Sequence, residues 1–275
     1  MLLGYVIYEG IEGEERDMFG SGVRHQEFAK LLWEARLKRN PIKPLTALWP
    51  DMTVDDAYAI QNWLIQFYLA NGDRPVGFKL GFTSLEMRRA MGIHDSNYGI
   101  LLASMIQLSP AKANDNLIHP RVEPEIAMRI GYRLSGTDIT LARVRDAITH
   151  VAPALEIVDS RFEHFRFTFL DNTADNSSAA GVVLGEWRDI SHVDPDRLWV
   201  KMSDGVQEVE GFSTAVMGSP LAAVSWLVAE RTRRGHPLPG GSVILTGGMT
   251  APFVLSPGTR IEGDFGPLGQ VVLQV

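Results

Sequence analysis

The chain has 275 residues, a length that suits one large domain or a large domain with a small appendage. Its 26 basic and 33 acidic residues give a formal net charge of −7 without any basic run, which argues against nucleic acid as a partner. Cysteine is absent, which excludes disulfides and thiolate chemistry and suits a reducing compartment such as the cytoplasm. No apolar stretch approaches the roughly 20 residues of a membrane helix, so we expect no membrane span.

The first 75 residues predict a helical N-terminal region. Residues 1–8 are apolar, but acidic residues follow and no basic flank is present, so they do not resemble a secretory signal. Thr53 and Asp56 have the spacing of a capping box, and apolar residues follow at helical spacing. Gly72 stands where this helix would end. We predict one helix here and a boundary near residue 75.

Most of the chain from residue 76 to 275 predicts short strands divided by turn-forming residues. The predicted strands cover residues 76–80, 122–130, 155–159, 182–184, 243–246 and 271–275. A helix is predicted at 220–235, because Ser219 can cap it, Pro220 suits its first turn and Gly235 can end it. We therefore predict an α+β fold that is mixed and β-rich, with a smaller helical N-terminal part.

Two glutamates in the strand predicted at 122–130 share one face. Side chains alternate along a strand, so Glu123 and Glu125 point together, away from the apolar face. Paired carboxylates raise each other's cost of ionisation and persist most easily beside a cation, although a solvated strand face would have the same pattern. Pro124 cannot donate a ladder hydrogen bond, which predicts an edge strand or an irregularity there.

Glu156 lies inside an apolar run that predicts a buried strand, where a lone ionised carboxylate is costly. A salt bridge to Arg161 or another arginine is one compensation. The other is a hard cation such as Mg²⁺ or Mn²⁺ held by three glutamate oxygens, with positions open for a chelating substrate. The 7 histidines show no pair at metal-ligand spacing, which disfavours zinc.

Three further segments carry polar groups suited to a small ligand. Lys79 stands among apolar residues and glycines, where burial would depress its pKa for acid or base chemistry; a surface lysine is the alternative. Residues 171–181 are rich in short hydrogen-bonding side chains, typical of a plain loop or of one that binds a polar ligand. Thr246 and Gly247 follow a predicted strand and offer backbone N–H groups to a carboxylate, or form a tight turn.

Taken together, these segments resemble the 2-oxo acid hydratase and decarboxylase family of aromatic meta-cleavage pathways, within the fumarylacetoacetate hydrolase superfamily. The matching segments read GFKLGFTS at 77–84, MGI at 91–93, YG at 98–99, RVEPEIA at 121–127, ALEIVDSR at 154–161, ADNSS at 174–178 and TGG at 246–248. The resemblance extends from about residue 53 to the C-terminus and includes no feature of residues 1–45.

This resemblance implies a fumarylacetoacetate-hydrolase-like fold and an active site with one Mg²⁺ or Mn²⁺. The implied metal ligands are Glu123, Glu125 and Glu156, the implied catalytic residue is Lys79, and the implied substrate contacts are Leu80, Asp175, Ser177, Thr246 and Gly247. It also implies a homo-oligomer and a complex with the pathway's partner hydratase or decarboxylase, with a small 2-oxo acid as substrate.

The implied activity is that of a metal-dependent lyase. Decarboxylases of this family convert 2-oxohex-3-enedioate (4-oxalocrotonate) to 2-hydroxypenta-2,4-dienoate, and 2-keto-4-pentenoate hydratases add water to that product. Both reactions need the same enolate stabilisation, so the metal motif does not separate them. Phe78 and the segments at 91–93 and 98–99 are more similar to decarboxylases, whereas residues 179–185 also suit hydratases. We predict decarboxylation, with hydration as the alternative; C–C bond hydrolysis, for which these segments offer no suitable histidine, and a non-catalytic partner rank lower.

Overall fold

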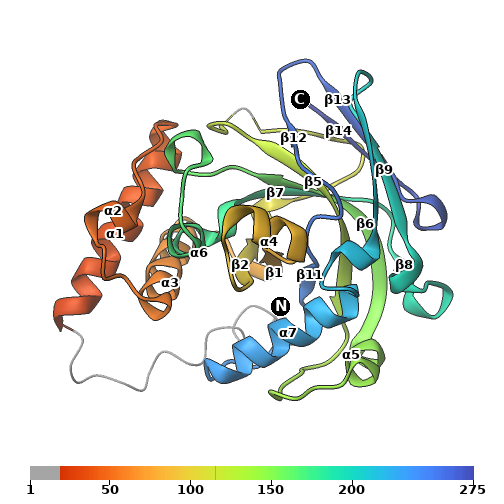
Figure 1. Ribbon diagram of the computed structural model, residues 1–275, viewed down its shortest axis with the longest axis horizontal. Coiled ribbons are helices and arrows are strands. Elements are labelled where there is room, and N and C mark those ends of the chain that lie inside the picture. Colours follow the sequence, from red (N-terminus) through yellow and green to blue (C-terminus); the bar gives the residue numbers. More distant parts are fainter. Residues whose placement is uncertain (1–18, 115) are drawn as a thin grey trace.

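The computed structural model describes residues 19–114 and 116–275, so the expectation for residues 1–8 lies outside the described residues. Three helices come first in this part of the chain and two sheets follow (Figure 1). The helices before the first strand are α1 (Phe19–Lys38), α2 (Leu45–Leu48) and α3 (Val54–Ala70). The change from helix to strand occurs at Pro75, but the helices also bond to the main body, because Thr46 donates to Asp171 and Gln61 donates to the Thr173 carbonyl.

The predicted capping box begins α3. The Thr53 side chain accepts from the Asp56 backbone N–H, and the Asp56 carboxylate accepts from the Thr53 N–H at 2.9 Å. The long helix α1 was not singled out from the sequence, because its apolar residues do not form one clean stripe. Leu32 is buried against α3, while Leu31 and Leu37 are exposed.

A nine-stranded sheet forms the centre, with strand order β2-β1-β11-β5-β6-β7-β3, β12 beside β5 and β8 beside β6. Its strands are β1 (Pro75–Gly81), β2 (Asn97–Leu102), β3 (Ile106–Leu108), β5 (Arg121–Ile130), β6 (Ile148–Val158), β7 (Ala179–Leu184), β8 (Arg188–Asp189), β11 (Val243–Leu245) and β12 (Phe253–Val254). Parallel pairs, such as β1 with β11, occur beside antiparallel ones, which makes the sheet mixed, as predicted.

A five-stranded sheet, of order β10-β9-β13-β14-β4, packs against β6 at the side away from the N-terminal helices (Figure 1). Its strands are β4 (Ala111–Lys112), β9 (Trp199–Ser203), β10 (Glu208–Phe212), β13 (Arg260–Asp264) and β14 (Gln270–Gln274). Every strand predicted from the sequence is confirmed, although the one predicted at 155–159 is the end of the longer β6.

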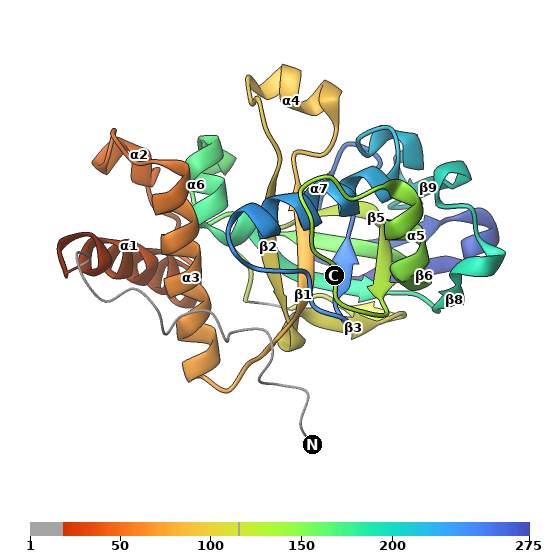
Figure 2. The same cartoon turned by 90° about the horizontal axis from the view of Figure 1, so that it is seen from below.

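The remaining helices surround the larger sheet. They are α4 (Leu85–Met91), α5 (Leu141–Ala147), α6 (Phe169–Ala174) and α7 (Pro220–Arg233). Short 3-10 helices are η1 (Ala103–Met105), η2 (Glu163–Phe165), η3 (Asn176–Ser178), η4 (Ile190–His192), η5 (Pro195–Arg197), η6 (Ser213–Ala215) and η7 (Gly266–Leu268). The predicted α7 begins at a Ser219 cap, whereas α4 projects from the body between β1 and β2 (Figure 2). No helix among the described residues combines the length and apolar character that a bilayer crossing requires.

Pro124 marks an irregularity inside the sheet, so the alternative of an edge strand is wrong. Strand β5 pairs with β6 along one side and with β11 and β12 along the other. Pro124 faces the interval between β11 and β12, where its carbonyl accepts from the Met249 N–H at 3.0 Å. A loop replaces the ladder at this point, so the missing proline N–H leaves no strand partner unsatisfied.

The close pairing of β1 with β11 gives a stability prediction. Gly77 pairs with Val243, and a Cβ at residue 77 would meet the Val243 carbonyl oxygen. We expect Gly77→Ala to lower the free energy of unfolding by about 1–3 kcal/mol, because backbone would have to shift. Gly22→Ala in α1 is the control, since nothing lies within 4 Å of the added Cβ. Urea unfolding measures both variants, and an equal loss in the two would contradict the expectation.

Candidate metal centre

Strands β5 and β6 bring three carboxylates together. Glu123 and Glu125 lie two residues apart on β5, and Glu156 on β6 is directly opposite Glu123 in the antiparallel register. Each of the three offers a carboxylate oxygen, and these oxygens lie within 4.8 Å of one another. The alternation of side chains along β5 aligns the first two, and the strand register adds the third.

Each of the two buried glutamates has one carboxylate oxygen without a partner in the described chain. Glu125 Oε2 accepts from the Gly247 N–H at 2.7 Å and Glu156 Oε1 has an ammonium group 3.1 Å away, but Glu125 Oε1 and Glu156 Oε2 have no partner. Burying carboxylate oxygens without donors is costly. A hard divalent cation would satisfy these oxygens, and a set of three carboxylates is the donor chemistry that Mg²⁺ and Mn²⁺ prefer.

The cation nearest to the cluster is Lys79, on β1. Its Nζ lies 3.1 Å from Glu156 Oε1 and donates to the Ser177 carbonyl at 2.9 Å. The alternative prediction, a salt bridge from Glu156 to Arg161 or another arginine, is therefore wrong. Arg161 lies beyond the end of β6 and binds Asp175, at the start of η3, instead.

The pKa expected for Lys79 also requires correction. Its side chain is buried, as predicted, and burial alone would lower its pKa. The charges of Glu156, Glu125 and Glu123 outweigh that effect and raise the pKa above the ordinary value. Lys79 is thus a charged group at neutral pH in this structure.

The same burial and the same neighbouring charges raise the pKa values of the glutamates. Burial raises the pKa of Glu123 to about 7, and the neighbouring charge of Glu156 adds to the shift. Burial, with Glu156 beside it, also raises the pKa of Glu125 well above its usual range. Three carboxylates share one ammonium group, so the cluster remains short of positive charge.

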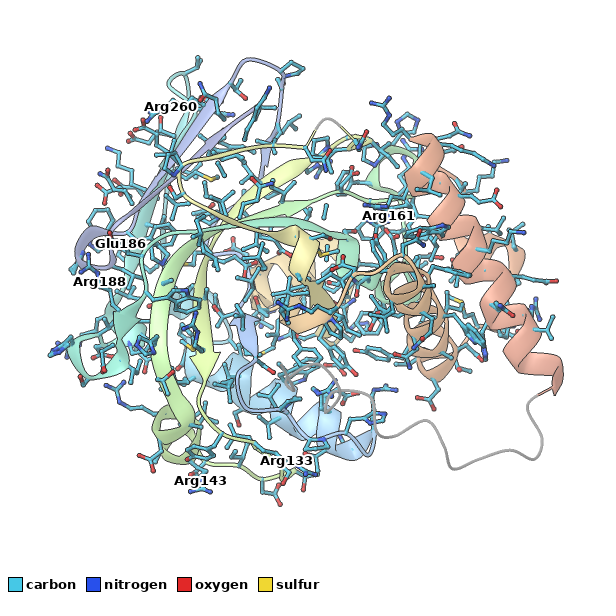
Figure 3. All side chains as sticks on the ribbon, turned by 180° about the vertical axis from the view of Figure 1, so that it is seen from behind. Arg133, Arg143, Arg161, Glu186, Arg188 and Arg260 are labelled. Carbon is cyan, nitrogen blue, oxygen red and sulfur yellow. The ribbon has the colours of Figure 1, made fainter. Side chains whose placement is uncertain are left out.

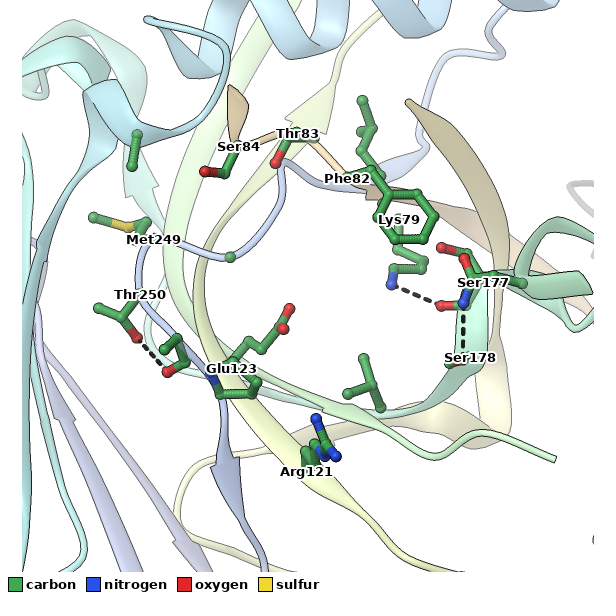
Figure 4. Close-up of a pocket in the computed structure, with 18 of the residues that line it drawn as sticks. Lys79, Phe82, Thr83, Ser84, Arg121, Glu123, Ser177, Ser178, Met249 and Thr250 are labelled. Atoms are coloured by element: carbon green, nitrogen blue, oxygen red, sulfur yellow. Dashed lines mark hydrogen bonds between the residues drawn. The ribbon is translucent and has the colours of Figure 1, made fainter. Parts of the chain in front are cut away.

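A cavity of about 520 Å³ opens beside this cluster (Figure 4). Lys79 and Glu123 lie on its wall, together with the aromatic residues Phe82, Phe165 and Phe167. The other lining residues are Leu80, Gly81, Thr83, Ser84, Glu86, Arg121, Val158, Asn172, Ser177, Ser178, Ala215, Gly248, Met249, Thr250, Ala251 and Pro252. No histidine of the described chain lines this cavity, so no histidine is placed to activate a water molecule there.

The residues predicted to contact substrate fall into two groups. Leu80 and Ser177 line the cavity together with Lys79. Asp175, Thr246 and Gly247 do not line it, so direct substrate contact by them has no geometric support. The Asp175 carboxylate binds Arg161, Thr246 Oγ1 donates to the Ile126 carbonyl, and the Gly247 N–H donates to Glu125. The predicted backbone N–H donor to a carboxylate thus exists at Gly247, but its acceptor is Glu125 of the carboxylate cluster.

The turn η3 places Ser177 beside Lys79 in an unusual conformation. Asn176, Ser177 and Ser178 all have positive φ, at 52°, 51° and 58°. Such residues cost free energy and persist where the surroundings fix them. Asn176 exchanges two hydrogen bonds with the Ile100 backbone, and Ser177 Oγ donates to Asn97 Oδ1.

A buried ion pair holds the start of this turn. Arg161 lies in the interior near the N-terminal helices, whereas Arg188 and Arg260 lie at the periphery (Figure 3). The guanidinium of Arg161 contacts the Asp175 carboxylate and backbone carbonyl. Asp175 therefore acts on the site through the backbone that carries Ser177.

Two side chains of the site, Arg121 and Asn97, are not predicted from the sequence. The alternation that aligns Glu123 with Glu125 also extends back to Arg121, and this was the available signal. Asn97 gave no local signal, because its contacts come from residues 172, 173 and 177, far along the chain.

The chain is similar to curated enzymes over most of its length. It is 35% identical over 252 residues to a 2-keto-4-pentenoate hydratase of Paraburkholderia xenovorans (strain LB400), covering 90% of this chain and 93% of the relative. It is 37% identical over 222 residues to a 4-oxalocrotonate decarboxylase of a Pseudomonas species, covering 80% and 86%. No family model matches the chain.

Solved structures agree with these relatives. The 4-oxalocrotonate decarboxylase from Pseudomonas putida G7, complexed with magnesium and adipate, has a TM-score of 0.89 and 32% identity, covering 92% of this chain and 97% of that one. A fumarylpyruvate hydrolase from Pseudomonas aeruginosa and a protein from Yersinia pestis CO92 that is described as a member of the fumarylacetoacetate hydrolase family share the fold at TM-scores of 0.55 and 0.56, with 16% and 14% identity. The predicted fold is thereby confirmed. The chain belongs to the family of 2-keto-4-pentenoate hydratases and 4-oxalocrotonate decarboxylases, which are lyase-type enzymes.

Proposed function

We propose that this chain decarboxylates 2-oxohex-3-enedioate (4-oxalocrotonate) to 2-hydroxypenta-2,4-dienoate with the help of a divalent metal ion. The observation that carries the proposal is the undersatisfied carboxylate cluster, with Lys79 beside it, at the wall of a largely apolar cavity. The decarboxylase that superposes at a TM-score of 0.89 was solved with magnesium and adipate, a six-carbon dicarboxylate, which supports both the ion and the substrate class.

Glu123, Glu125 and Glu156 would hold Mg²⁺ or Mn²⁺. When bound, the ion would supply a Lewis acid for the carboxylate and carbonyl oxygens at C1 and C2 of a 2-oxo acid. Only Glu123 of the three lines the cavity, so a substrate would approach the cluster from the side of Glu123.

The chain's own residues would manage charge and proton during bond cleavage. The C5–C6 bond breaks, its electron pair forms C4=C5, C3=C4 shifts to C2=C3, and the C2 oxygen gains the negative charge. Lys79, held by the Ser177 carbonyl, would stabilise that oxygen and, in its ammonium form, donate the proton that completes 2-hydroxypenta-2,4-dienoate. The C6 carboxylate leaves as CO₂, so the atoms and the charge balance.

Hydration is the second candidate, and the similarity to hydratases at 35% identity favours it. A hydratase would place water near C4 of the dienol. Thr83, Ser84 and Glu86 bring polar groups to the cavity and would be the residues to orient that water. The aromatic walls formed by Phe82, Phe165 and Phe167 suit a reaction that releases neutral CO₂, which is why we rank decarboxylation first.

Product analysis separates the two candidates. With Mg²⁺ and 2-oxohex-3-enedioate we expect CO₂ release, and with 2-hydroxypenta-2,4-dienoate we expect no addition of water. Lys79→Met is expected to reduce kcat by at least about 100-fold, because a positioned proton donor is lost. Water addition without CO₂ release would reverse the ranking. Full activity of the metal-free protein would reject the proposal.

Metal binding provides a test that does not depend on turnover. We expect Glu156→Gln to weaken Mg²⁺ binding by more than about 100-fold in calorimetry, because a direct ligand should matter more than its surroundings. Glu86→Gln is the matched control, since Glu86 lines the same cavity but is exposed and outside the cluster. Equal affinities for the two variants would remove Glu156 from the proposed ligand set.

The same titration should depend on pH. Because the pKa of Glu123 is raised to about 7 without the ion, Mg²⁺ has to displace a proton from a largely protonated group below that pH. We expect the affinity to increase as the pH rises from about 6 to about 8. An affinity that falls over this range would contradict ionised carboxylates as the ligands.

Assembly and location remain parts of the proposal. We infer a cytoplasmic homo-oligomer that forms a complex with the pathway's partner hydratase or decarboxylase. Sedimentation of the purified chain, alone and with a partner enzyme, would measure both associations.

A further inference from the structure

Arg121 is the second cation of the cavity, and its charge acts on Glu123 by lowering the pKa of that carboxyl without forming an ion pair with it. Lys79 and Arg121 are the two basic residues that line the cavity within the described chain. Lys79 is committed to Glu156 and to Ser177, whereas Arg121 forms no ion pair with any described carboxylate. Its guanidinium instead lies over the Phe165 ring, 4.0 Å from the centroid. A positive charge without a carboxylate partner thus remains at the cavity wall.

The strand fixes where this charge lies relative to the metal cluster. Arg121 precedes Glu123 by two residues on β5, so both side chains emerge on the same face, about 7 Å apart at their Cα atoms. Figure 4 shows Arg121, Glu123 and Lys79 on different parts of the cavity wall. The cavity wall thus carries this guanidinium two strand residues away from a glutamate of the cluster.

We propose that Arg121 binds the distal carboxylate of the substrate and thereby selects dicarboxylic over monocarboxylic 2-oxo acids. The inference rests on the proposed function, because it assumes that the proximal carboxylate and 2-oxo group lie at the glutamate cluster. A second carboxylate entering a cavity with aromatic walls would lose its hydration, and an unpaired buried charge is costly. The guanidinium supplies the planar, charge-assisted donors that a carboxylate needs.

Stacking on Phe165 supports this role over a loose surface charge. The ring restricts the guanidinium and leaves its N–H edge available, because a cation over an aromatic face uses none of its hydrogen-bond donors. Phe165 lines the cavity as well, so the stacked pair forms one continuous part of its wall.

Arg121 should contribute to binding rather than to bond cleavage. Its interaction is strongest with the charged carboxylate and weakens as that group becomes neutral CO₂. Interactions of this kind lower KM without raising kcat. The expected signature in turnover of 2-oxohex-3-enedioate is therefore a higher KM for Arg121→Met with no fall in kcat.

The decisive measurement is equilibrium binding of two unreactive ligands in the presence of Mg²⁺. 2-Oxohexanedioate and 2-oxohexanoate share the 2-oxo acid end and the chain length, and only the first has a distal carboxylate. Neither contains the C3=C4 double bond that decarboxylation requires. Calorimetry should give the wild-type chain a preference of about 10- to 100-fold for the dicarboxylate, the range of a hydrogen bond to a charged group.

Variants assign that preference to one residue. Arg121→Met, which keeps an apolar stem over Phe165, should abolish the preference while the affinity for 2-oxohexanoate stays within about twofold. Arg121→Lys should retain part of it, since lysine keeps the charge without the fork geometry. Arg129→Met is the matched control, because Arg129 is also on β5 and also stacks on an aromatic ring, that of Trp187, outside the cavity. It should keep the full preference.

The outcomes distinguish this inference from the proposed function. If both ligands bind with Mg²⁺ but with equal affinity, or if Arg121→Met keeps the preference, the inference fails and the proposed function stands. If neither ligand binds, or if binding does not require the ion, the proposed function fails and the inference fails with it. Loss of both affinities in Arg121→Met, with a normal unfolding midpoint, would also overturn selective recognition of the distal carboxylate.

Discussion

The concentration of negative charge across the β5–β6 pair is the constraint on which the rest of the site depends. Three glutamates meet there, two of them fully buried, with one lysine to balance them. Isolated carboxylates do not remain ionised in such a place, and the raised pKa of Glu123 expresses that cost. A divalent cation bound between these carboxylates would stabilise the sheet by offsetting their repulsion. The same repulsion between carboxylates therefore destabilises the metal-free fold and increases its affinity for the ion.

The surroundings of the cluster serve to hold it in that state. Lys79 comes from β1, two strands away from β5, and the loop after β11 closes over Pro124 and donates the Gly247 N–H to Glu125. The left-handed turn at η3 presents the Ser177 carbonyl to Lys79, and the Arg161–Asp175 pair fixes the beginning of that turn. The polar groups of the η3 turn and the Arg161–Asp175 pair thus serve to position Lys79.

Part of this arrangement follows from local rules. The capping box at Thr53 and the strand alternation at Glu123 and Glu125 depend on neighbours within a few residues, and both appear in the structure as predicted. The β-rich class of the fold follows from many short apolar segments between turn-forming residues. By contrast, Asp175 lies in the polar segment that the sequence suggested would contact a ligand, but its carboxylate forms an internal ion pair with Arg161. A motif does not reveal which of two buried groups a carboxylate will face.

The sequence by itself determined that two glutamates of β5 share a face, that Glu156 is buried and needs compensation, and that Lys79 lies among apolar residues, because periodicity and burial are properties of short segments. Only the tertiary structure decided that the strand register sets Glu156 opposite Glu123, and that its partner is a lysine and not an arginine. It also decided the direction of the Lys79 pKa, which depends on charges from two other segments of the chain. Contacts between distant segments fix the sign of an electrostatic effect, and no local pattern contains them.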